Sequence, residues 1–218
     1  MKLKIYKIFF TILAIALVVV VVLIAFKYIN GYQNDKENEK VVEAFMQNLE
    51  HTNKSTNIID ENVIDNQNEI QQVTMNGYNV IGVVKIPKID IEYPILDVET
   101  NSPADTEKPM KISIVKYWGR NVNDYGNLSI AGHNNYNGTM FGKTRKLTIG
   151  DTVELTDLTG RTIKYEIYDR LVVDPNDISI LKTNDETIRE VTLITCTNGH
   201  KNRLIFKAKE IQELKGEF

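Results

Sequence analysis

The sequence contains one cysteine, Cys196, among 218 residues, and only three histidines. A single cysteine excludes an intramolecular disulfide, so its thiol is either a small buried apolar group or a reactive one. A zinc site on Cys196 and His200 would need two or three further thiolate or imidazole ligands, and only His133 remains in the same domain. We therefore expect no metal site of this kind. His51 lies in a polar segment and is expected to be solvated.

Acidic residues are absent from the first 27 positions, which contain four lysines. The nineteen residues 8–26, IFFTILAIALVVVVVLIAF, form an apolar run without a charge. At about 1.5 Å per residue, a helix of this length matches a hydrocarbon core of about 30 Å. The following stretch AFKYINGY offers no good small-residue cleavage site for a signal peptide. We expect residues 1–27 to be an uncleaved signal anchor with a cytoplasmic N-terminus, and the rest of the chain to be exported.

The exported part is acidic. Without the four lysines of residues 1–27, 22 basic side chains remain against 29 acidic ones, a net charge of −7. This charge argues against a nucleic-acid partner.

The remaining chain has two parts of different composition. Residues 28–76 are rich in Asn, Asp, Glu and Gln and are expected to form a polar stalk. They include one short amphipathic helix with Val42, Phe45, Met46 and Leu49 on one face. Residues 77–218 contain at least seven short runs rich in Val, Ile, Thr and Tyr, separated by turn residues such as those in DLTGRT. This pattern predicts a mainly β domain, a small barrel or sandwich without internal repeats.

Cys196 is the last residue of one of these predicted strands. EVTLITC and RLIFKAKEI are consecutive strands joined by TNGHKN, and an antiparallel pairing with Cys196 opposite Arg203 would put both on one face. A guanidinium beside a thiol favours the thiolate and offers N–H donors to a developing oxyanion. A register shifted by one residue would instead send Arg203 to the other face, as a solvated edge-strand residue.

Two histidines compete as the base for this thiol. His133, in AGHN, directly follows a predicted strand and begins a loop rich in Gly and Asn. Such a position suits a catalytic group, because the strand holds the backbone while the loop leaves room for substrate. His200 lies near the tip of the hairpin and is expected to face solvent. His133 is therefore the better candidate.

Residues 77–211 resemble the sortases, membrane-anchored cysteine transpeptidases of Gram-positive bacteria. TLITC resembles the nucleophile motif of that family, Arg203 matches the arginine that begins its next strand, and AGHN carries its histidine. KLTIGDTVEL and RTIKYEIYDRLVVDPNDISIL also resemble sortase segments, in the same order. The resemblance implies a closed eight-stranded β-barrel, preceded here by the N-terminal transmembrane helix. It implies Cys196 as nucleophile, His133 as acid/base group, Arg203 as substrate and oxyanion ligand, and Thr195 as a residue that binds substrate.

The resemblance also implies the reaction and the partners. Cys196 would attack the Thr carbonyl of a C-terminal sorting signal such as Leu-Pro-x-Thr-Gly on a secreted protein and form a thioester. His133 would protonate the departing amine, and an amine of a cell-wall precursor or of another protein would resolve the thioester. No cofactor is expected. For the calcium site of some class A sortases, the candidate acids Glu99, Asp105, Glu107 and Glu186 match no clear pattern, so calcium dependence stays open.

The subclass stays open as well. NGTMFGK resembles class B, whereas TLITC and IGDTVEL resemble classes A and D. The 17 residues 174–190 are short for the helical insertion of class B. No Asp-Pro-aromatic lid motif precedes the barrel, and QELKGEF, which follows the last predicted strand, contains no second membrane segment. Both observations argue against a pilus-polymerising class C enzyme.

Two other functions are compatible with parts of the sequence. A papain-like peptidase uses the same Cys and His chemistry, but its cysteine begins a helix in a Cys-Gly-x-Cys-aromatic signature, and Cys196 ends a strand. A membrane-tethered β-domain that only binds wall components would have a Cys196 that is inert to thiol reagents.

Overall fold

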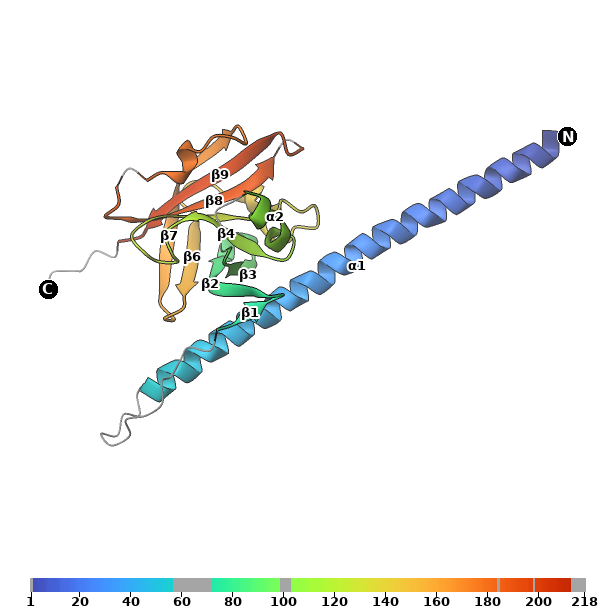
Figure 1. The fold of residues 1–218 in the computed structure, drawn as a ribbon. Helices are drawn as coiled ribbons and strands as arrows, with labels where there is room; N and C mark the ends of the chain where they lie inside the picture. The colour runs from blue at the N-terminus through green and yellow to red at the C-terminus, as the bar shows by residue number, and fades with distance from the viewer. Residues whose placement is uncertain (1, 57–71, 99–102, 184, 198, 213–218) are drawn as a thin grey trace. The chain divides into compact units, whose positions relative to one another are not determined.

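The computed structural model describes residues 2–56, 72–98, 103–183, 185–197 and 199–212 (Figure 1). Its first element is one continuous helix, α1 (Lys2–Thr56), so the apolar run and the expected amphipathic helix belong to the same element. Near its N-terminus this helix is long and apolar enough, by length and composition, to cross a membrane. By internal contacts the chain divides into two units, Met1–Glu37 and Asn38–Phe218.

Nine strands lie within the described residues, together with four shorter helical segments (Figure 1). The strands are β1 (Thr74–Met75), β2 (Tyr78–Ile86), β3 (Ile91–Leu96), β4 (Ile114–Gly119), β5 (Gly126–Ala131), β6 (Thr152–Asp157), β7 (Thr162–Val173), β8 (Arg189–Thr197) and β9 (Asn202–Glu210). The short helical segments are η1 (Pro87–Ile89), α2 (Pro103–Met110), η2 (Phe141–Lys146) and η3 (Ser179–Leu181).

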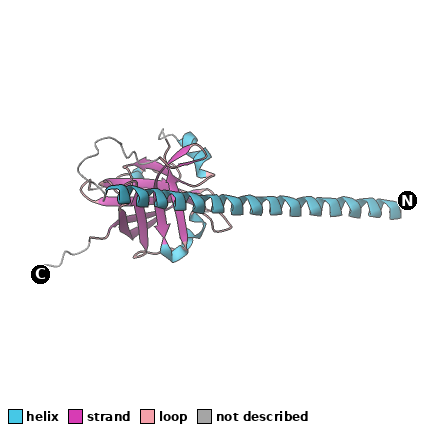
Figure 2. Cartoon of the chain, turned by 90° about the horizontal axis from the view of Figure 1, so that it is seen from below, coloured by secondary structure: helices cyan, strands magenta, loops and turns pink. Residues whose placement is uncertain are grey.

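The strands close into a barrel. Their order is β1-β2-β3-β4-β5-β8-β9-β7-β6, and β2 also pairs with β6, so β2 to β9 form a closed ring of eight. Figure 2 shows the strands together, with short helices at the edges. The pairs β3–β4 and β5–β8 are parallel, and the other pairs are antiparallel. The expected closed eight-stranded β-barrel is confirmed, and the two-residue strand β1 is added at the edge of β2.

Side-chain alternation along each strand separates two apolar clusters. The first contains residues from all eight barrel strands, such as Val84, Val191, Leu193 and Phe206, and is the barrel interior. The second includes Ile194 and Ile205, which point to the opposite face of β8 and β9. Because Cys196 follows Ile194 by two residues, it lies on this outer face.

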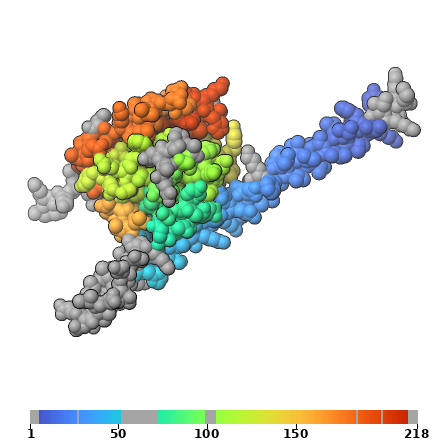
Figure 3. All heavy atoms as spheres, viewed as in Figure 1, coloured from blue at the N-terminus to red at the C-terminus, as the bar shows by residue number. Residues whose placement is uncertain are grey.

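The outer cluster is covered in part by α1. Val42, Phe45 and Leu49 are buried in it, whereas Met46 is 38% exposed. Three of the four residues predicted for the apolar helix face are thus buried. The Asn38 side-chain amide also donates to the Ile112 carbonyl oxygen, 3.0 Å away. Figure 3 shows the pale-blue residues of this part of the helix beside the green surface of β1 and β2.

The turn predicted in DLTGRT is confirmed between β6 and β7. The Gly160 amide donates to the Asp157 carbonyl oxygen at 3.0 Å, and Gly160 has a φ of +81°, which L-residues rarely adopt. This short turn lets β6 and β7 pair directly and extend the barrel wall.

Candidate active site

Cys196 lies at the end of β8, and the partner strand β9 places Arg203 directly opposite it. The register predicted from the sequence is confirmed. The thiol is half-buried, and directly opposed residues of an antiparallel pair share a face. Arg203 Nη1 donates to the His200 carbonyl oxygen at 3.4 Å, so the guanidinium is held toward the hairpin turn.

His133 reaches the same place along the other neighbour of β8. In the parallel pair β5–β8, Ala131 lies opposite Ile194, and the Gly132 amide continues the ladder by donating to the Ile194 carbonyl oxygen at 3.1 Å. Both His133 and Cys196 are two residues past this last pair. Because adjacent strands are about 4.8 Å apart, the two residues lie level at the same end of neighbouring chain segments.

Two side-chain hydrogen bonds hold the backbone on both sides of His133. The Thr195 hydroxyl donates to the Gly132 carbonyl oxygen, and the Asn134 amide donates to the Cys196 carbonyl oxygen, each at 2.8 Å. The residues before and after His133 are therefore both bound to β8, the strand that carries the nucleophile. Sequence reasoning missed Asn134. AGHNNYNG contains three asparagines, and nothing in the sequence distinguishes the one that bonds to β8.

Thr195 has a different environment from the one that the family resemblance suggests. It is 3% exposed, and its hydroxyl is engaged inside the protein with Gly132. A direct contact of Thr195 with substrate stays a prediction, and its observed hydrogen bond supports a role in positioning His133.

The pKa of His133 lies below its ordinary value of 6.5, chiefly because partial burial disfavours the charged imidazolium. Glu107 of α2 raises this pKa, whereas His200 and Lys111 lower it. His200 is exposed, as expected, and has a φ of +72° in the β8–β9 turn. It is nevertheless close enough to act electrostatically on His133, so it belongs to the surroundings of the site.

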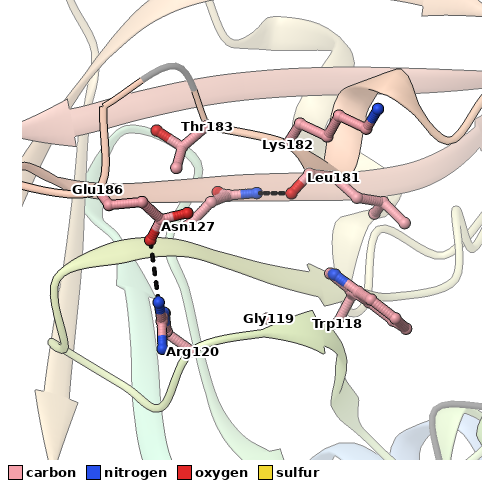
Figure 4. A pocket seen from close by; sticks show the side chains of 8 residues that line it. All are labelled: Trp118, Gly119, Arg120, Asn127, Leu181, Lys182, Thr183 and Glu186. Carbon is pink, nitrogen blue, oxygen red and sulfur yellow. Dashed lines mark hydrogen bonds and ion pairs between the residues drawn. The ribbon is translucent and has the colours of Figure 1, made fainter.

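A pocket of about 450 Å³ lies farther along the outer face. It lies between strands β4 and β5 on one side and the end of η3 with the segment that follows it on the other. Figure 4 shows the residues that line it: Trp118, Gly119, Arg120, Asn127, Leu181, Lys182, Thr183 and Glu186. The Asn127 amide donates to the Leu181 carbonyl oxygen at 3.0 Å, and its carbonyl accepts from Thr192 at 2.9 Å. Thr192 precedes Cys196 by four residues, about 13 Å along a strand. The pocket is therefore remote from the thiol.

The acids considered for calcium do not converge in the described part of the chain. Glu186 forms an ion pair with Arg120 at 3.1 Å, and Asp105 and Glu107 lie on α2. Glu99 lies outside the described residues. Among the residues that are described, there is no group of three or more His, Cys, Asp or Glu side chains suited to hold a metal ion.

Comparison with known proteins matches the model of the sortase domain to residues 84–211, more than half of the chain. Sortase A of Bacillus anthracis is 28% identical, over 88% of this chain and 89% of the relative. Sortase A of Staphylococcus aureus is 26% identical, over 93% and 96%. The solved structure of a Clostridium perfringens Sortase D5 transpeptidase superposes with a TM-score of 0.58 at 28% identity, covering 83% of this chain and 99% of that one.

Proposed function

Because the chain belongs to the sortase family, whose members are membrane-anchored cysteine transpeptidases that attach LPxTG proteins to the cell wall, we propose that Cys196, His133 and Arg203 carry out this reaction here. Family membership decides against the two alternatives, a papain-like peptidase and a β-domain that only binds wall components. The observation that carries the assignment of residues is the level position of His133 and Cys196 on the adjacent segments after β5 and in β8.

In the first half-reaction, the Cys196 sulfur attacks the Thr carbonyl carbon of the sorting signal, and the carbonyl oxygen becomes an oxyanion. Arg203 donates N–H groups to this oxygen. The C–N bond to the next residue then breaks, His133 gives its proton to the departing nitrogen, and the acyl group stays on sulfur as a thioester.

In the second half-reaction, a neutral amine attacks the thioester carbonyl carbon. His133 takes a proton from the attacking nitrogen, the C–S bond breaks, and the thiolate of Cys196 is released. The hydrogen bonds from Thr195 and Asn134 support this double use of His133, because they hold its backbone beside Cys196.

An LPxTG peptide panel tests the assignment on the full chain in detergent, with the acyl-enzyme detected by the intact mass of the protein. We expect a thioester with one or more peptides, a transfer product when an amine is added, and neither with Cys196→Ala. Turnover by a folded Cys196→Ala variant would contradict the nucleophile. We also expect His133→Ala to lower the rate far more than His200→Ala, and comparable losses would mean that His200 is the acid.

For the finer topology, we propose that residues 1–27 form a cytoplasmic tip and membrane anchor, 28–76 a stalk, and 77–218 an extracellular catalytic domain. The apolar segment of α1 supports this arrangement, and so do the basic residues that precede it without any acid. The acceptor is proposed to be an amine of a peptidoglycan precursor or of another protein.

The single cysteine gives a clean test of the topology. We expect a membrane-impermeant maleimide to label Cys196 in intact cells that express the full chain, with Cys196→Ala as the control. Labelling only after the membrane is permeabilised would contradict an extracellular catalytic domain.

A further inference from the structure

The two segments that form the site carry positive charge and no carboxylate. Residues 125–150, which include His133, and residues 191–209, which include Cys196, contain no Asp or Glu. They contain seven cationic residues: Lys143, Arg145, Lys146, Lys201, Arg203, Lys207 and Lys209. Since the chain after residue 27 has a net charge of −7, this segregation runs against its overall balance.

None of these seven cations forms an ion pair within the described residues. The six ion pairs found there use Lys85, Lys88, Arg120, Arg161, Lys164 and Arg189. None of those pairs includes Lys143, Arg145, Lys146, Lys201 or Arg203. Some cations elsewhere on the barrel, such as Lys116 and Arg170, also form none of these pairs, but beside the thiol the unpaired cations are concentrated, and Glu107 of α2 is the carboxylate that acts on His133.

Two of these cations can be placed against the site by their contacts. Arg145 Nη2 lies 3.5 Å from the hydroxyl oxygen of Thr197, the residue next to Cys196, whose side chain points to the other face at the end of β8. The Lys143 side chain packs on Gly138 in the loop after His133, where an added Cβ would lie 3.1 Å from Lys143 Cε. Lys146 ends the same short helix, η2, and Lys201 lies in the β8–β9 turn beside His200. Lys143, Arg145, Lys146 and Lys201 are called the cationic edge below.

The opposite side of Cys196 is apolar. Ile194, two residues earlier on the same face of β8, belongs to a buried cluster with Ala131 and Ile180. We assign the apolar Leu-Pro end of an LPxTG-like signal to this side. In each tetrahedral intermediate, the acyl chain and the bond to nitrogen leave the former carbonyl carbon in different directions. The departing nitrogen, and the amine that later replaces it, therefore lie toward the cationic edge.

We propose that the cationic edge selects an acceptor that carries an anionic group, a carboxylate or a phosphate, close to its nucleophilic amine. This inference rests on the proposed function. A simple amine is mainly an ammonium ion near neutral pH, and an uncompensated cationic edge repels it. A nearby anion offsets that repulsion, and Arg145 is suited to bind it because a guanidinium pairs with carboxylates and phosphates through two parallel N–H donors. Neighbouring cations also lower the pKa of the bound amine, which increases its reactive neutral fraction.

The test measures transfer by the full chain in detergent, with one LPxTG peptide and paired acceptors. Glycylglycine is compared with glycylglycinamide, and 2-aminoethyl phosphate is compared with ethanolamine. We expect the anionic member of at least one pair to have about 10-fold higher kcat/KM for transfer, the size of one charge-assisted hydrogen bond. The pair with the larger ratio distinguishes a carboxylate acceptor from a phosphate acceptor. The preference should fall as salt is raised.

Substitutions in the cationic edge test which residues cause the preference for anionic acceptors. Arg145→Gln, and a triple change of Lys143, Arg145 and Lys146 to Gln, should bring the ratio of anionic to neutral acceptors close to one. The ratio is taken within each variant, so an effect on the first half-reaction cancels. Lys164→Gln is the matched control, because Lys164 is an exposed lysine that pairs with Glu154 on β6, and it should keep the wild-type ratio.

Two results would overturn the inference: equal use of neutral and anionic acceptors by the wild type, or an unchanged preference in both Arg145→Gln and the triple variant. Thioester formation without any acceptor reports separately on the proposed function. A chain that forms the thioester but shows no acceptor preference refutes the cationic edge alone.

Discussion

At the scale of single residues, the Cys196–Arg203 pair shows how one register position sets a chemical role. Arg203 is opposite the thiol, and one of its nitrogens is engaged with the His200 carbonyl oxygen. The rest of its planar group stays available to a substrate carbonyl. An arginine in this position can bind an oxyanion and brace a peptide backbone at the same time.

We predict that Arg203→Lys is nearly as damaging as Arg203→Ala. An ammonium is a point charge and cannot donate in two directions from one plane, and the loss of one oxyanion donor typically lowers the rate by about 10²–10³. The measurement is kcat/KM of both variants on one peptide. Near-native turnover of Arg203→Lys would mean that charge alone suffices.

The second prediction concerns the protonation of His133. Its pKa is lowered by burial and raised by Glu107, so Glu107→Gln should lower it further. As pH rises, the His133 imidazolium, which is the proton donor, is then deprotonated at a lower pH in this variant than in the wild type. NMR titration of the His133 imidazole in the Cys196→Ala background measures this directly. A midpoint at or above 6.5, or an upward change in Glu107→Gln, would refute the electrostatic account.

At the scale of elements, the junction between β8 and the segment after β5 positions the two reactive groups. Asn134 Nδ2 binds the Cys196 carbonyl oxygen across a separation of 62 residues. Asn135, its neighbour, bonds instead within the loop to the Thr139 hydroxyl at 2.9 Å. One asparagine thus links the loop to the strand, and the next one only shapes the loop.

We therefore predict that Asn134→Ala lowers the rate constant of acylation by about 10-fold, because small displacements of a catalytic group cost up to about 100-fold. Asn135→Ala should have a much smaller effect. The KM for peptide and the alkylation rate of Cys196 should stay near native values in Asn134→Ala. Equal losses in the two variants, or a change only in KM, would contradict a positioning role.

The second element is the part of α1 that begins at Asn38. Phe45 is 2% exposed, and the adjacent Met46 is 38% exposed. Phe45→Ala should lower the free energy of unfolding of the Asn38–Phe218 unit by about 3–5 kcal/mol. Met46→Ala should cost about 1 kcal/mol or less. Denaturant unfolding followed by the fluorescence of Trp118 measures both, and similar small changes would mean that the helix does not stabilise the barrel.

At the scale of the whole molecule, closure depends on a close approach between β2 and β6. Gly82 lies opposite Asp157 in this pairing. A Cβ at position 82 would lie 2.6 Å from the Thr156 carbonyl oxygen and 3.0 Å from a methyl carbon of Val122. Because the obstacle includes backbone, the strands must separate to admit a side chain.

Gly82→Ala is predicted to lower the free energy of unfolding by about 1–3 kcal/mol, the usual cost of overpacking. The site at the end of β8 is on the other side of the ring, so activity at low temperature should be retained. The measurement is the unfolding midpoint together with peptide cleavage at two temperatures. An unchanged unfolding midpoint would show that the β2–β6 pairing has room for a methyl group at position 82.

Features that depend on residues close together in the chain can be predicted from the sequence. Alternating side chains identify the strands, and TNGHKN is short enough for the Cys196–Arg203 register to follow from a local hairpin. The apolar run of residues 8–26 predicts a helix in the same way. The choice of His133 over His200 also came from local context, a strand end against a hairpin tip, and from the family resemblance. The sequence does not predict which residues from distant parts of the chain lie beside these groups in the fold.

Which strands lie side by side follows from the folded barrel and not from the sequence pattern. A period of two tells which face a residue occupies, but it does not tell which distant strand lies beside it. The parallel pairing of β5 with β8 joins segments about sixty residues apart, and it alone brings His133 level with Cys196 and selects Asn134 from three similar asparagines. The tertiary structure likewise places Arg145 beside Thr197 and Phe45 in the outer cluster. These contacts are non-local, so the free energy that selects them comes from the closed barrel as a whole and not from the preferences of any single segment.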